Sequence, residues 1–482
     1  MSTLDDEHAA QLGRMVDVFP ESRELGERFA AAGHELYLVG GSVRDTLLAA
    51  GDTSITANLD LDFATSARPQ DTERLVRPWA NAVWLTGSEY GTVSCEHIHG
   101  DRRRIIEITT YRSDEYVSGS RHPTVEFGDT IEGDLSRRDF TINAMAVRVP
   151  DFLFVDEFGG LGDLQARRLR TPVDPHASFG DDPLRMLRLA RFAARFDGSV
   201  DDDTWAAAQL LAPKLEEISS ERVRDELVKL LCAPHPDVGI DLVLALGLDP
   251  WVLPELRDLR DCVDPMHRHK DVYRHTLAVI RNVMELEGDE PDVTLRMAAL
   301  LHDVAKPQTR RIHGDGTVSF LHHDMEGARV TRQRMEALRF DKQTTRDVAD
   351  LVRMHLRFHT YKQGWTDSAV RRYVRDAGPL LQRLNALTRA DVTTGNRQRA
   401  TAIQRRMDDL EERIVELRAQ EELDRLRPPI DGNQIMEHLG IPAGRDVGRA
   451  WNHLLELRIE RGPMSQAEAL DELDRWWDEQ AR

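Results

Sequence analysis

Cysteine is scarce in this chain, with three residues among 482. Cys95, Cys232 and Cys262 lie far apart, so they match no metal-binding spacing and form no disulfide framework of the kind that staples a small fold. We expect all three to be small buried residues. Hydrophobic cores must hold the chain together, and its length predicts two to four domains.

Long apolar runs are also missing. No stretch of eighteen consecutive apolar residues exists, and the first residues, MSTLDDEHAAQ, lack the basic region and apolar core of a secretion signal. These two absences predict a soluble cytoplasmic protein with no contact to a membrane.

Positive charge is not in excess either. The formal net charge is −20 and the isoelectric point is near 5.4, which argues against a protein that coats nucleic acid nonspecifically. Any nucleic-acid site must therefore be a local basic patch. The candidates are residues 102–104, 137–138, 167–195 and 397–406.

The first third of the chain alternates between strand and helix patterns. Beyond Gly162 the apolar period becomes helical. This order predicts an α+β fold, with a small mixed sheet followed by an all-helical region. The predicted strands are residues 35–39, 59–63, 92–98, 104–110 and 144–149, and a helix is predicted near residues 70–80.

A glycine turn ends the first predicted strand. Gly40, Gly41 and Ser42 follow the apolar residues 37–39, and a short helix is predicted directly after them. Glycines let backbone N–H groups approach phosphate oxygens closely, and the helix N-terminus behind them favours negative charge. With Arg44 nearby, this turn is predicted to hold a triphosphate.

Two carboxylates lie two residues apart on the next predicted strand. Because side chains alternate between the faces of a strand, Asp60 and Asp62 project on the same side, close enough to share a divalent cation. A cation there neutralises the charge that builds up when a hydroxyl attacks a nucleoside triphosphate. We therefore expect Mg²⁺ and metal-assisted phosphoryl transfer. The alternative is a solvated strand edge without catalytic function.

These motifs resemble a known family. LVGGSVRD at residues 38–45, followed by LDLDFAT at residues 59–65, is similar to the nucleotidyltransferase head of the polymerase beta superfamily. The similarity is to the class II branch, which contains CCA-adding enzymes and bacterial poly(A) polymerases. It implies addition of C, C and A to the 3′ end of tRNA from CTP and ATP. Further similar motifs follow in family order, namely RRDFTINAMA at 137–146, DEFGGLGDL at 156–164 and DDPLR at 181–185.

The resemblance also implies a ribose site. Asp139 would accept a hydroxyl of the incoming ribonucleotide, with Arg138 as its partner or as a phosphate contact. The alternative is that Asp139 only stabilises the start of a helix. Between residues 112 and 134 the chain is charged and poor in aliphatic residues, which predicts a mobile loop. In the family a loop at this place helps the switch from C to A addition.

Asp182 and Arg185 are candidates for base selection. We expect them one turn apart on a helix, where a carboxylate can accept from an exocyclic amine and a guanidinium can donate to a ring atom. The family has the same pair in an EDxxR motif, although Asp181 here replaces its Glu. The alternative is an ion pair between Asp182 and Arg185. Further along the same helical face, Arg188, Arg191 and Arg195 are predicted to line the nucleotide and the RNA 3′ end.

Histidine becomes frequent after Pro265. Imidazole and carboxylate groups on a helical scaffold suit one or two transition-metal ions. The order of these residues resembles an HD-type phosphohydrolase domain, which some CCA-adding enzymes carry, with metal-dependent phosphatase or 2′,3′-cyclic phosphodiesterase activity. The alternative is a scaffold that has kept its ligands without catalysis. The expected metal ligands are His275, His302, Asp303, His323, His355 and Asp391.

Together these features predict five segments. They are an N-terminal extension at residues 1–20, a nucleotidyltransferase head at 21–165, a helical neck and RNA-binding region at 166–262, an HD-type metal domain at 263–395 and a helical tail for the tRNA body at 396–482. The expected partners are tRNA, ATP and CTP, with no obligate protein partner.

Two other functions fit parts of this pattern. A poly(A) or A-adding polymerase shares every motif of the head. An HD-type phosphohydrolase with a degenerate RNA-binding head fits the second half, although the intact Asp60 and Asp62 speak against it.

Overall fold

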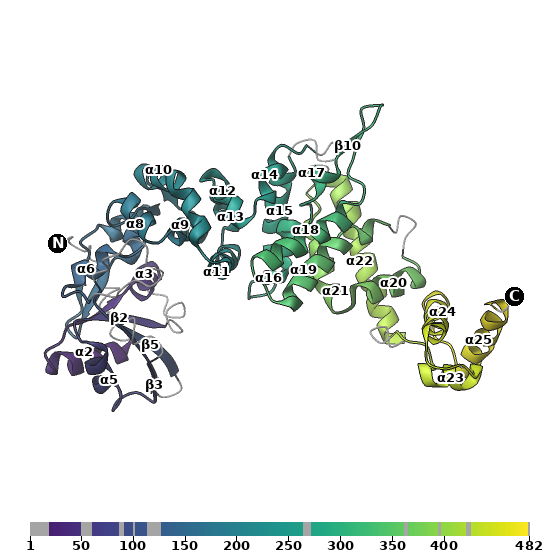
Figure 1. Cartoon of the computed structure of the whole chain (residues 1–482), viewed down its shortest axis with the longest axis horizontal. Helices are drawn as coiled ribbons and strands as arrows, with labels where there is room; N and C mark the ends of the chain where they lie inside the picture. The colour runs from purple at the N-terminus through teal and green to yellow at the C-terminus, as the bar shows by residue number, and fades with distance from the viewer. Residues whose placement is uncertain are drawn as a thin grey trace. The chain divides into compact units, whose positions relative to one another are not determined.

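A computed structural model describes residues 19–49, 60–85, 91–99, 102–112, 127–263, 271–360, 365–393, 397–420 and 426–480. These residues belong to two units, Met1–Val252 and Leu253–Arg482 (Figure 1). Most of the predicted N-terminal extension and residues 113–126 of the predicted loop lie outside the described residues. Within the described residues, no helix is long and apolar enough to span a membrane.

The first unit begins with a mixed seven-stranded sheet, as the α+β prediction requires. Its strand order is β3-β4-β5-β2-β1-β6-β7. Strands β2 and β5 run parallel, and the other neighbouring pairs are antiparallel. The strands are β1 (Leu36–Val39), β2 (Leu61–Thr65), β3 (Ala82–Trp84), β4 (Thr92–His99), β5 (Arg102–Thr110), β6 (Ala146–Val149) and β7 (Leu153–Val155).

The two faces of the sheet differ in their cover. Helices α2 (Pro20–Ala31) and α5 (Pro69–Val76) pack against the strands, and Phe63 and Ile106 are buried. On the other face, α6 (Ile131–Ser136) covers an apolar cluster around Tyr37 and Ala64. Asp62 on β2 and Glu107 on β5 belong to this second face and are exposed, so the face is open where the carboxylates lie.

Helices follow the sheet within the first unit. Helix α9 is amphipathic: its apolar side chains, including Leu187 and Phe192, are buried, whereas its arginines lie on the other side. It packs against α11 and α12. The helices are α3 (Gly41–Leu48), α7 (Gly160–Gln165), α8 (Pro175–Asp181), α9 (Leu184–Phe196), α10 (Asp202–Leu211), α11 (Ser220–Leu231), α12 (Pro236–Ala245) and α13 (Asp249–Val252), with short strands β8 (Arg168–Leu169) and β9 (Ser199–Val200).

The second unit is helical apart from the small hairpin of β10 (Arg311–Ile312) and β11 (Val318–Ser319). Helices α15, α16, α19 and α21 pack together, and α18 packs against α19. The histidines predicted as metal ligands lie in α15, at the start of α18 and directly after α16 and α19. The helices are α14 (Glu255–Arg260), α15 (Val272–Met284), α16 (Val293–Leu301), α17 (Lys306–Thr309), α18 (His323–Ala337), α19 (Lys342–Met354), α20 (Asp367–Ala377), α21 (Leu381–Ala390) and α22 (Arg397–Gln420).

The last three helices form a core of their own. Helices α23 (Gly432–Leu439), α24 (Arg445–Arg461) and α25 (Gln466–Gln480) bury Ile435, Leu454 and Leu473 against one another. Helix α22 instead packs against α20 and α21, and Trp365 donates a hydrogen bond to the carbonyl of Arg406 at 3.1 Å.

Candidate functional sites

The two predicted catalytic carboxylates lie at the open face of the sheet. Asp60 directly precedes β2, and Asp62 lies within it. In the register of the parallel pair, Asp62 is opposite Glu107. Although Asp62 is exposed at the open face, desolvation by the surrounding protein and the charges of Glu107 and Asp60 raise its pKa to about 6, and Arg138 opposes this shift. Three crowded carboxylates suit Mg²⁺, which prefers oxygen ligands, because a cation relieves their repulsion.

The glycine turn depends on the conformation of Gly40. Its φ is +66°, and a Cβ at this position would come within 2.9 Å of the Arg138 guanidinium. A glycine is therefore required both for the backbone and for the close approach. The Ser42 hydroxyl donates to the backbone carbonyl of Asp60 at 3.0 Å. This hydrogen bond joins the turn to the start of the catalytic strand.

Arg44 is buried in a hydrogen-bonded network. It donates to both carboxylate oxygens of Asp45, at 2.9 and 3.0 Å, and to the side-chain oxygen of Asn143. The Asn143 amide in turn donates to Asp139 at 2.8 Å. Asn143 thus links the predicted triphosphate residue to the predicted ribose residue through one neutral side chain.

Asp139 is held on both oxygens. Its Oδ1 accepts from Asn143 and from the Phe140 N–H, and its Oδ2 lies 2.7 Å from the Arg188 guanidinium. Burial alone would raise the pKa of Asp139, but Arg188 and these hydrogen bonds outweigh it and lower the pKa. The carboxylate is therefore ionised at neutral pH and can accept a hydrogen bond from a ribose hydroxyl.

Asp134 orients the neighbouring pair Arg137 and Arg138. Its carboxylate lies 2.7 Å from Arg137 and 3.1 Å from Arg138. Burial raises the pKa of Asp134, but the two guanidinium groups outweigh burial and lower it. This buried charge fixes Arg138 over the glycine turn.

Asp182 and Arg185 are not on one helix, contrary to the prediction. Asp182 is extended at the end of α8, with φ −138° and ψ 96°, and Arg185 lies in the first turn of α9. No ion pair joins the two among the described residues. Instead, Arg222 of α11 lies 3.1 Å from Asp182, and Arg185 donates to the Ser178 hydroxyl at 2.8 Å.

One cavity of about 410 Å³ collects these groups. It has Asp62 and the glycine turn on the side of the sheet and the arginines of α9 on the helical side. Its lining contains most of the residues predicted for the head, whereas Ser42 and Asp60 are not among the lining residues. The cavity is lined by residues that include Gly40, Gly41, Arg44, Asp62, Arg138, Asp139, Asn143, Asp182, Arg185, Arg188 and Arg191.

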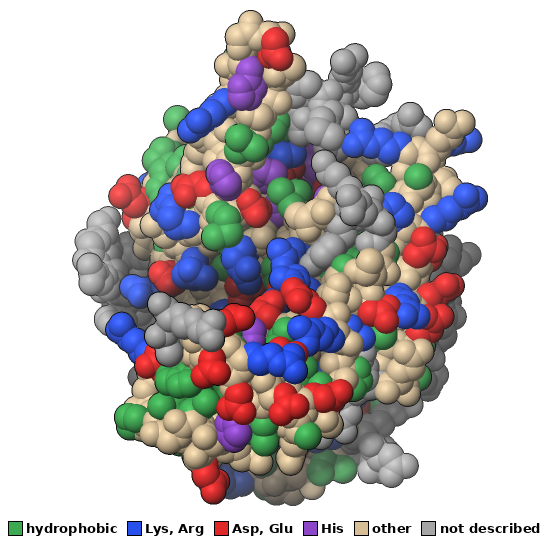
Figure 2. Space-filling model, turned by 90° about the vertical axis from the view of Figure 1, so that its right-hand side faces the viewer, with side chains coloured by type: hydrophobic (Ala, Val, Ile, Leu, Met, Phe, Trp, Pro, Cys, Tyr) green, Lys and Arg blue, Asp and Glu red, His purple; other side chains and the backbone are tan. Residues whose placement is uncertain are grey.

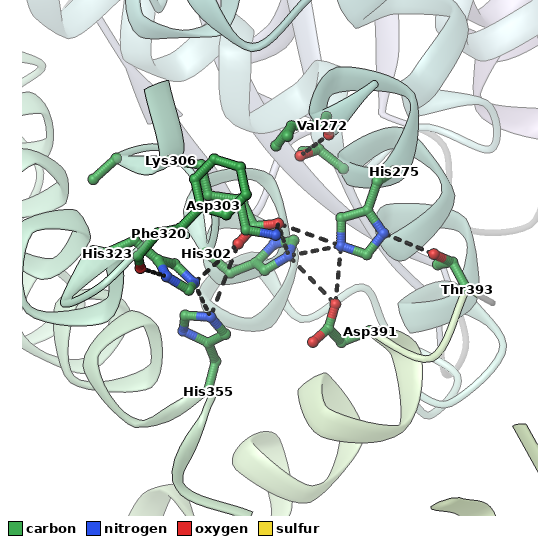
Figure 3. Close-up of polar contacts among 12 residues, drawn as sticks. Val272, His275, His302, Asp303, Lys306, Phe320, His323, His355, Asp391 and Thr393 are labelled. Carbon is green, nitrogen blue, oxygen red and sulfur yellow. Dashed lines mark hydrogen bonds and ion pairs between the residues drawn. The ribbon is translucent and has the colours of Figure 1, made fainter. Parts of the chain in front are cut away.

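The second unit brings all six predicted metal ligands together (Figure 3). They form two groups, each with its ligand atoms within 4.8 Å of one another. Asp303 connects the groups, because its Oδ2 lies 3.2 Å from His302 and its Oδ1 lies 3.4 Å from His323. The first group is His275, His302 and Asp391, and the second is Asp303, His323 and His355.

The histidine tautomers favour metal binding. The Nδ1 atoms of His302, His323 and His355 lie 2.6 to 2.8 Å from backbone carbonyl oxygens, which can only accept. Each ring therefore donates from Nδ1 and leaves a lone pair on Nε2 when neutral. The Nε2 atoms of His323 and His355 nevertheless lie 3.2 Å apart. Two facing lone pairs repel, and a shared cation removes the repulsion.

Charge in this cluster is distributed unevenly. Burial lowers the pKa of His302, but the carboxylates of Asp303 and Asp391 outweigh it and raise the pKa to about 10. Burial and the neighbouring His302 lower the pKa of His355 to about 4. Lys306 lies 2.9 Å from Asp303. The donor set of imidazoles and carboxylates fits divalent transition metals.

A second cavity, also of about 410 Å³, opens beside these ligands. Asp303, His323 and His355 lie at one end, and Phe320 and Ile403 give it apolar walls. Figure 2 shows histidine side chains gathered on this face below the projecting hairpin, with Lys and Arg side chains beside them. The cavity can admit a phosphate ester to the metal ligands.

Three side chains that contact or lie beside the predicted site residues were not assigned a role from the sequence. Glu107 lies beside Asp62 and forms no ion pair among the described residues. Asn143 and Arg222 received no role, although Asn143 belongs to the RRDFTINAMA motif. Only the pairing of β2 with β5 and the packing of α11 reveal the positions of Glu107 and Arg222.

Three protein families match this chain. The poly(A) polymerase head domain matches residues 36–170, and the probable RNA and SrmB-binding site of polymerase A matches residues 199–259. The HD domain matches residues 272–417. The first match contains the cavity residues up to Asn143, and the third contains all six metal-ligand candidates.

Curated relatives extend over much of the chain. An A-adding tRNA nucleotidyltransferase of Deinococcus radiodurans is 35% identical over 368 residues, which are 74% of this chain and 82% of that protein. A CCA-adding enzyme of Levilactobacillus brevis is 38% identical over 240 residues, or 49% of this chain. The chain spans slightly more than half the length of that second relative, 56%.

Solved structures share the fold. The CCA-adding enzyme of Bacillus stearothermophilus in complex with CTP superposes with a TM-score of 0.70 at 22% identity, covering 96% of this chain and 99% of that one. The Thermotoga maritima CCA-adding enzyme complexed with tRNA gives a TM-score of 0.61 at 19% identity, covering 99% of this chain and 100% of that one.

Proposed function

The chain belongs to the class II family of CCA-adding tRNA nucleotidyltransferases and bacterial poly(A) polymerases, and from this premise we propose that it adds C, C and A to the 3′ end of tRNA. CTP and ATP are the nucleotide substrates and pyrophosphate is the second product. The observation that carries the proposal is the cavity of the first unit, where Asp62, the Gly40 turn and the Asp182–Arg185 pair face one space.

In this proposal the open face of the sheet is the centre of the reaction. Asp60 and Asp62, with Glu107 beside them, would hold Mg²⁺, which lowers the pKa of the RNA 3′ hydroxyl and neutralises the leaving pyrophosphate. The backbone N–H groups of Gly40 and Gly41 bind triphosphate oxygens, and Arg138 lies over the same turn. The 3′ oxygen forms a bond to the α-phosphorus as the bond to pyrophosphate breaks.

The remaining cavity residues choose the nucleotide. Asp139 is ionised and accepts a ribose hydroxyl, with Asn143 and Arg188 fixing its orientation. Asp182 accepts from the exocyclic amine of C or A, and Arg185 donates to the ring. Ser42 and Arg44 support the triphosphate site from behind: Ser42 through Asp60, and Arg44 through Asp45 and Asn143.

A-only addition is the second candidate. The relative that the chain covers to 82% bears the name of an A-adding enzyme. A tRNA transcript that lacks all three terminal nucleotides, and a second transcript that ends in CC, separate the two functions. Incorporation of CMP on the first transcript supports CCA addition. ATP incorporation on the second transcript, without CMP incorporation on the first, overturns it in favour of A-only addition, and long A tails would indicate a poly(A) polymerase.

For the second unit we propose a metal-dependent phosphohydrolase with two divalent metals. His275, His302 and Asp391 would hold one ion and His323 and His355 the other, with Asp303 shared. Bound metal would supply a water nucleophile at neutral pH. Lys306 lies beside Asp303 at the cavity and can bind a phosphate oxygen. Opening of a 2′,3′-cyclic phosphate to its monoester, or release of phosphate from a terminal monoester, should stop with EDTA and in Asp303→Asn. Phosphate release without any nucleotide addition would favour a phosphohydrolase whose head is degenerate.

The proposal also sets the partners and the compartment. We propose tRNA, ATP and CTP as the ligands, no obligate protein partner, and the cytoplasm as the site of action. The RNA-contacting segments would be residues 166–262 and the tail at 396–482. The mass of the purified chain with and without tRNA, measured by light scattering, tests tRNA binding and the absence of an obligate protein partner.

A further inference from the structure

A separate cavity of about 390 Å³ lies in the first unit, away from the catalytic one. Its floor is apolar and includes Leu48 at the end of α3 and the ring of Phe196 at the end of α9. Cationic side chains and one histidine surround it, namely Arg167, Arg168, Arg195 and His235. None of them belongs to the reaction proposed above.

Helix α9 connects the two cavities. Arg188 lines the catalytic cavity and Arg195 lines this one, seven residues further along. Seven residues are about 20° short of two full turns, so both arginines lie on the same side of the helix, about 10.5 Å apart along its axis. Phe192 and Phe196, four residues apart, line the catalytic cavity and this one respectively. Their rings stack at 6.0 Å with an interplanar angle of 4°.

The cations at the rim are available to an anion to different extents. Arg195 lies 3.0 Å from Asp45, and Arg168 forms an ion pair with Asp163. Arg167 is exposed, and no ion-pair partner for it exists among the described residues. Its φ is +51°, a conformation that side-chain-bearing residues rarely adopt and that tends to persist at functional positions.

An apolar floor with an arginine rim suits single-stranded RNA. Ribose and base faces pack on apolar and aromatic side chains, and the phosphates bind the guanidinium groups. A small isolated anion would leave the floor uncovered. The acidic net charge of −20 makes a local cluster of this kind the expected way to hold RNA.

We propose that this cavity binds the sugar-phosphate backbone of the tRNA acceptor end, with Arg167 as a phosphate contact. The proposal rests on the function proposed above, because RNA whose 3′ end occupies the catalytic cavity then continues along α9. Arg195 and Arg168 add positive charge at the rim.

The test measures tRNA binding directly by the full-length chain, in a filter-binding salt series without nucleotide. Arg167→Glu should weaken binding about tenfold and lower the slope of log affinity against log salt by about 1. The Michaelis constant for CTP at saturating tRNA should not change. Arg74→Glu is the matched control, because it makes the same charge reversal on α5, where Asp71 is the only ion-pair partner of Arg74 among the described residues.

Equal tRNA affinities of Arg167→Glu and Arg74→Glu would overturn the proposal, as would a change in the CTP constant alone. Arg167→Gln, with thermal unfolding as a check on folding, provides the same test with a smaller perturbation. Because binding is measured without catalysis, a wild-type chain that binds tRNA but adds no nucleotide would refute the proposed function separately.

Discussion

Asp62 of β2 and Glu107 of β5 lie opposite each other on parallel neighbouring strands, and the charge of Glu107 helps to raise the pKa of Asp62 to about 6. Glu107 is therefore electrostatically coupled to the predicted catalytic carboxylate although it lies on another strand. A metal ion bound here would be influenced by three carboxylates.

We predict that Glu107→Gln lowers the rate of nucleotide addition about 10- to 100-fold and raises the Mg²⁺ concentration needed for half-maximal rate. Loss of the charge should also move the pKa of Asp62 down toward its ordinary value. Initial rates over a Mg²⁺ series measure the effect, with Asp62→Ala as the inactive reference. Glu96→Gln on the neighbouring strand is the control, and an unchanged Mg²⁺ dependence in Glu107→Gln would contradict the prediction.

Asp182→Ala should loosen the choice among nucleotides. Without the carboxylate, nothing accepts from the exocyclic amine, so the preference for CTP and ATP over UTP and GTP should fall about tenfold or more. Arg222→Gln removes the ion pair but keeps Asp182. Comparison of kcat/KM for the four nucleotides checks both variants. If Asp182→Ala keeps the wild-type preferences while its overall rate falls, Asp182 is structural.

The two groups of candidate metal ligands in the second unit predict that the chain binds two metal ions. Purified wild-type chain should hold two divalent ions, whereas His275→Ala and His355→Ala should each hold about one, since each removes a ligand from one group. Metal analysis by mass spectrometry after dialysis measures this. His359→Gln is the control because His359 lines the same cavity outside both ligand groups. A single ion in the wild type, lost entirely in His275→Ala, would refute the two-ion arrangement.

We predict that Asp134 contributes to the free energy of unfolding in a pH-dependent way. Its pKa is lowered in the folded chain, so its contribution is present above pH 4 and is lost as the pH falls through the folded pKa. Asp134→Asn should lower the free energy of unfolding of the first unit by about 3 kcal/mol at pH 7, because two arginines lose their partner.

The difference between wild type and Asp134→Asn should shrink below pH 4, as followed by thermal unfolding. Asp129→Asn is the control, because Asp129 is exposed and its ion pair with Arg68 is long at 3.8 Å. A difference that stays constant from pH 7 to pH 3 would exclude ionisation as the cause.

Local sequence patterns predicted the elements that carry the catalytic head. The period of two predicted Asp60 and Asp62 on one strand. The strand appears as β2 two residues later than expected, so it contains Asp62 and is directly preceded by Asp60. Strands β3 and β7 were not predicted because each has only three residues. Helix α6 begins inside the predicted loop, where Thr130 caps it by accepting from the Gly133 N–H. The assignment of roles to the individual cavity residues remains a prediction.

The error at Asp182 has a local cause. The residue before a proline is disfavoured in the helical region because the proline ring clashes with it. Pro183 therefore breaks the predicted helix, and Asp182 becomes extended between α8 and α9. In the second unit the order of residues in the chain predicted the six candidate metal ligands, which the fold brings together. Their division into two groups could not be predicted, because it depends on how α15, α16, α18, α19 and α21 pack.

The hydrogen bond from Ser42 to the carbonyl of Asp60 has a mechanical meaning. Under the proposed function, this bond would couple the turn that anchors the pyrophosphate to the strand that carries Asp62. Recognition of the nucleobase would depend on a different segment, the junction between α8 and α9. The geometry of the transfer site would then stay constant over successive additions, while the base-recognition segment adjusts to each nucleotide.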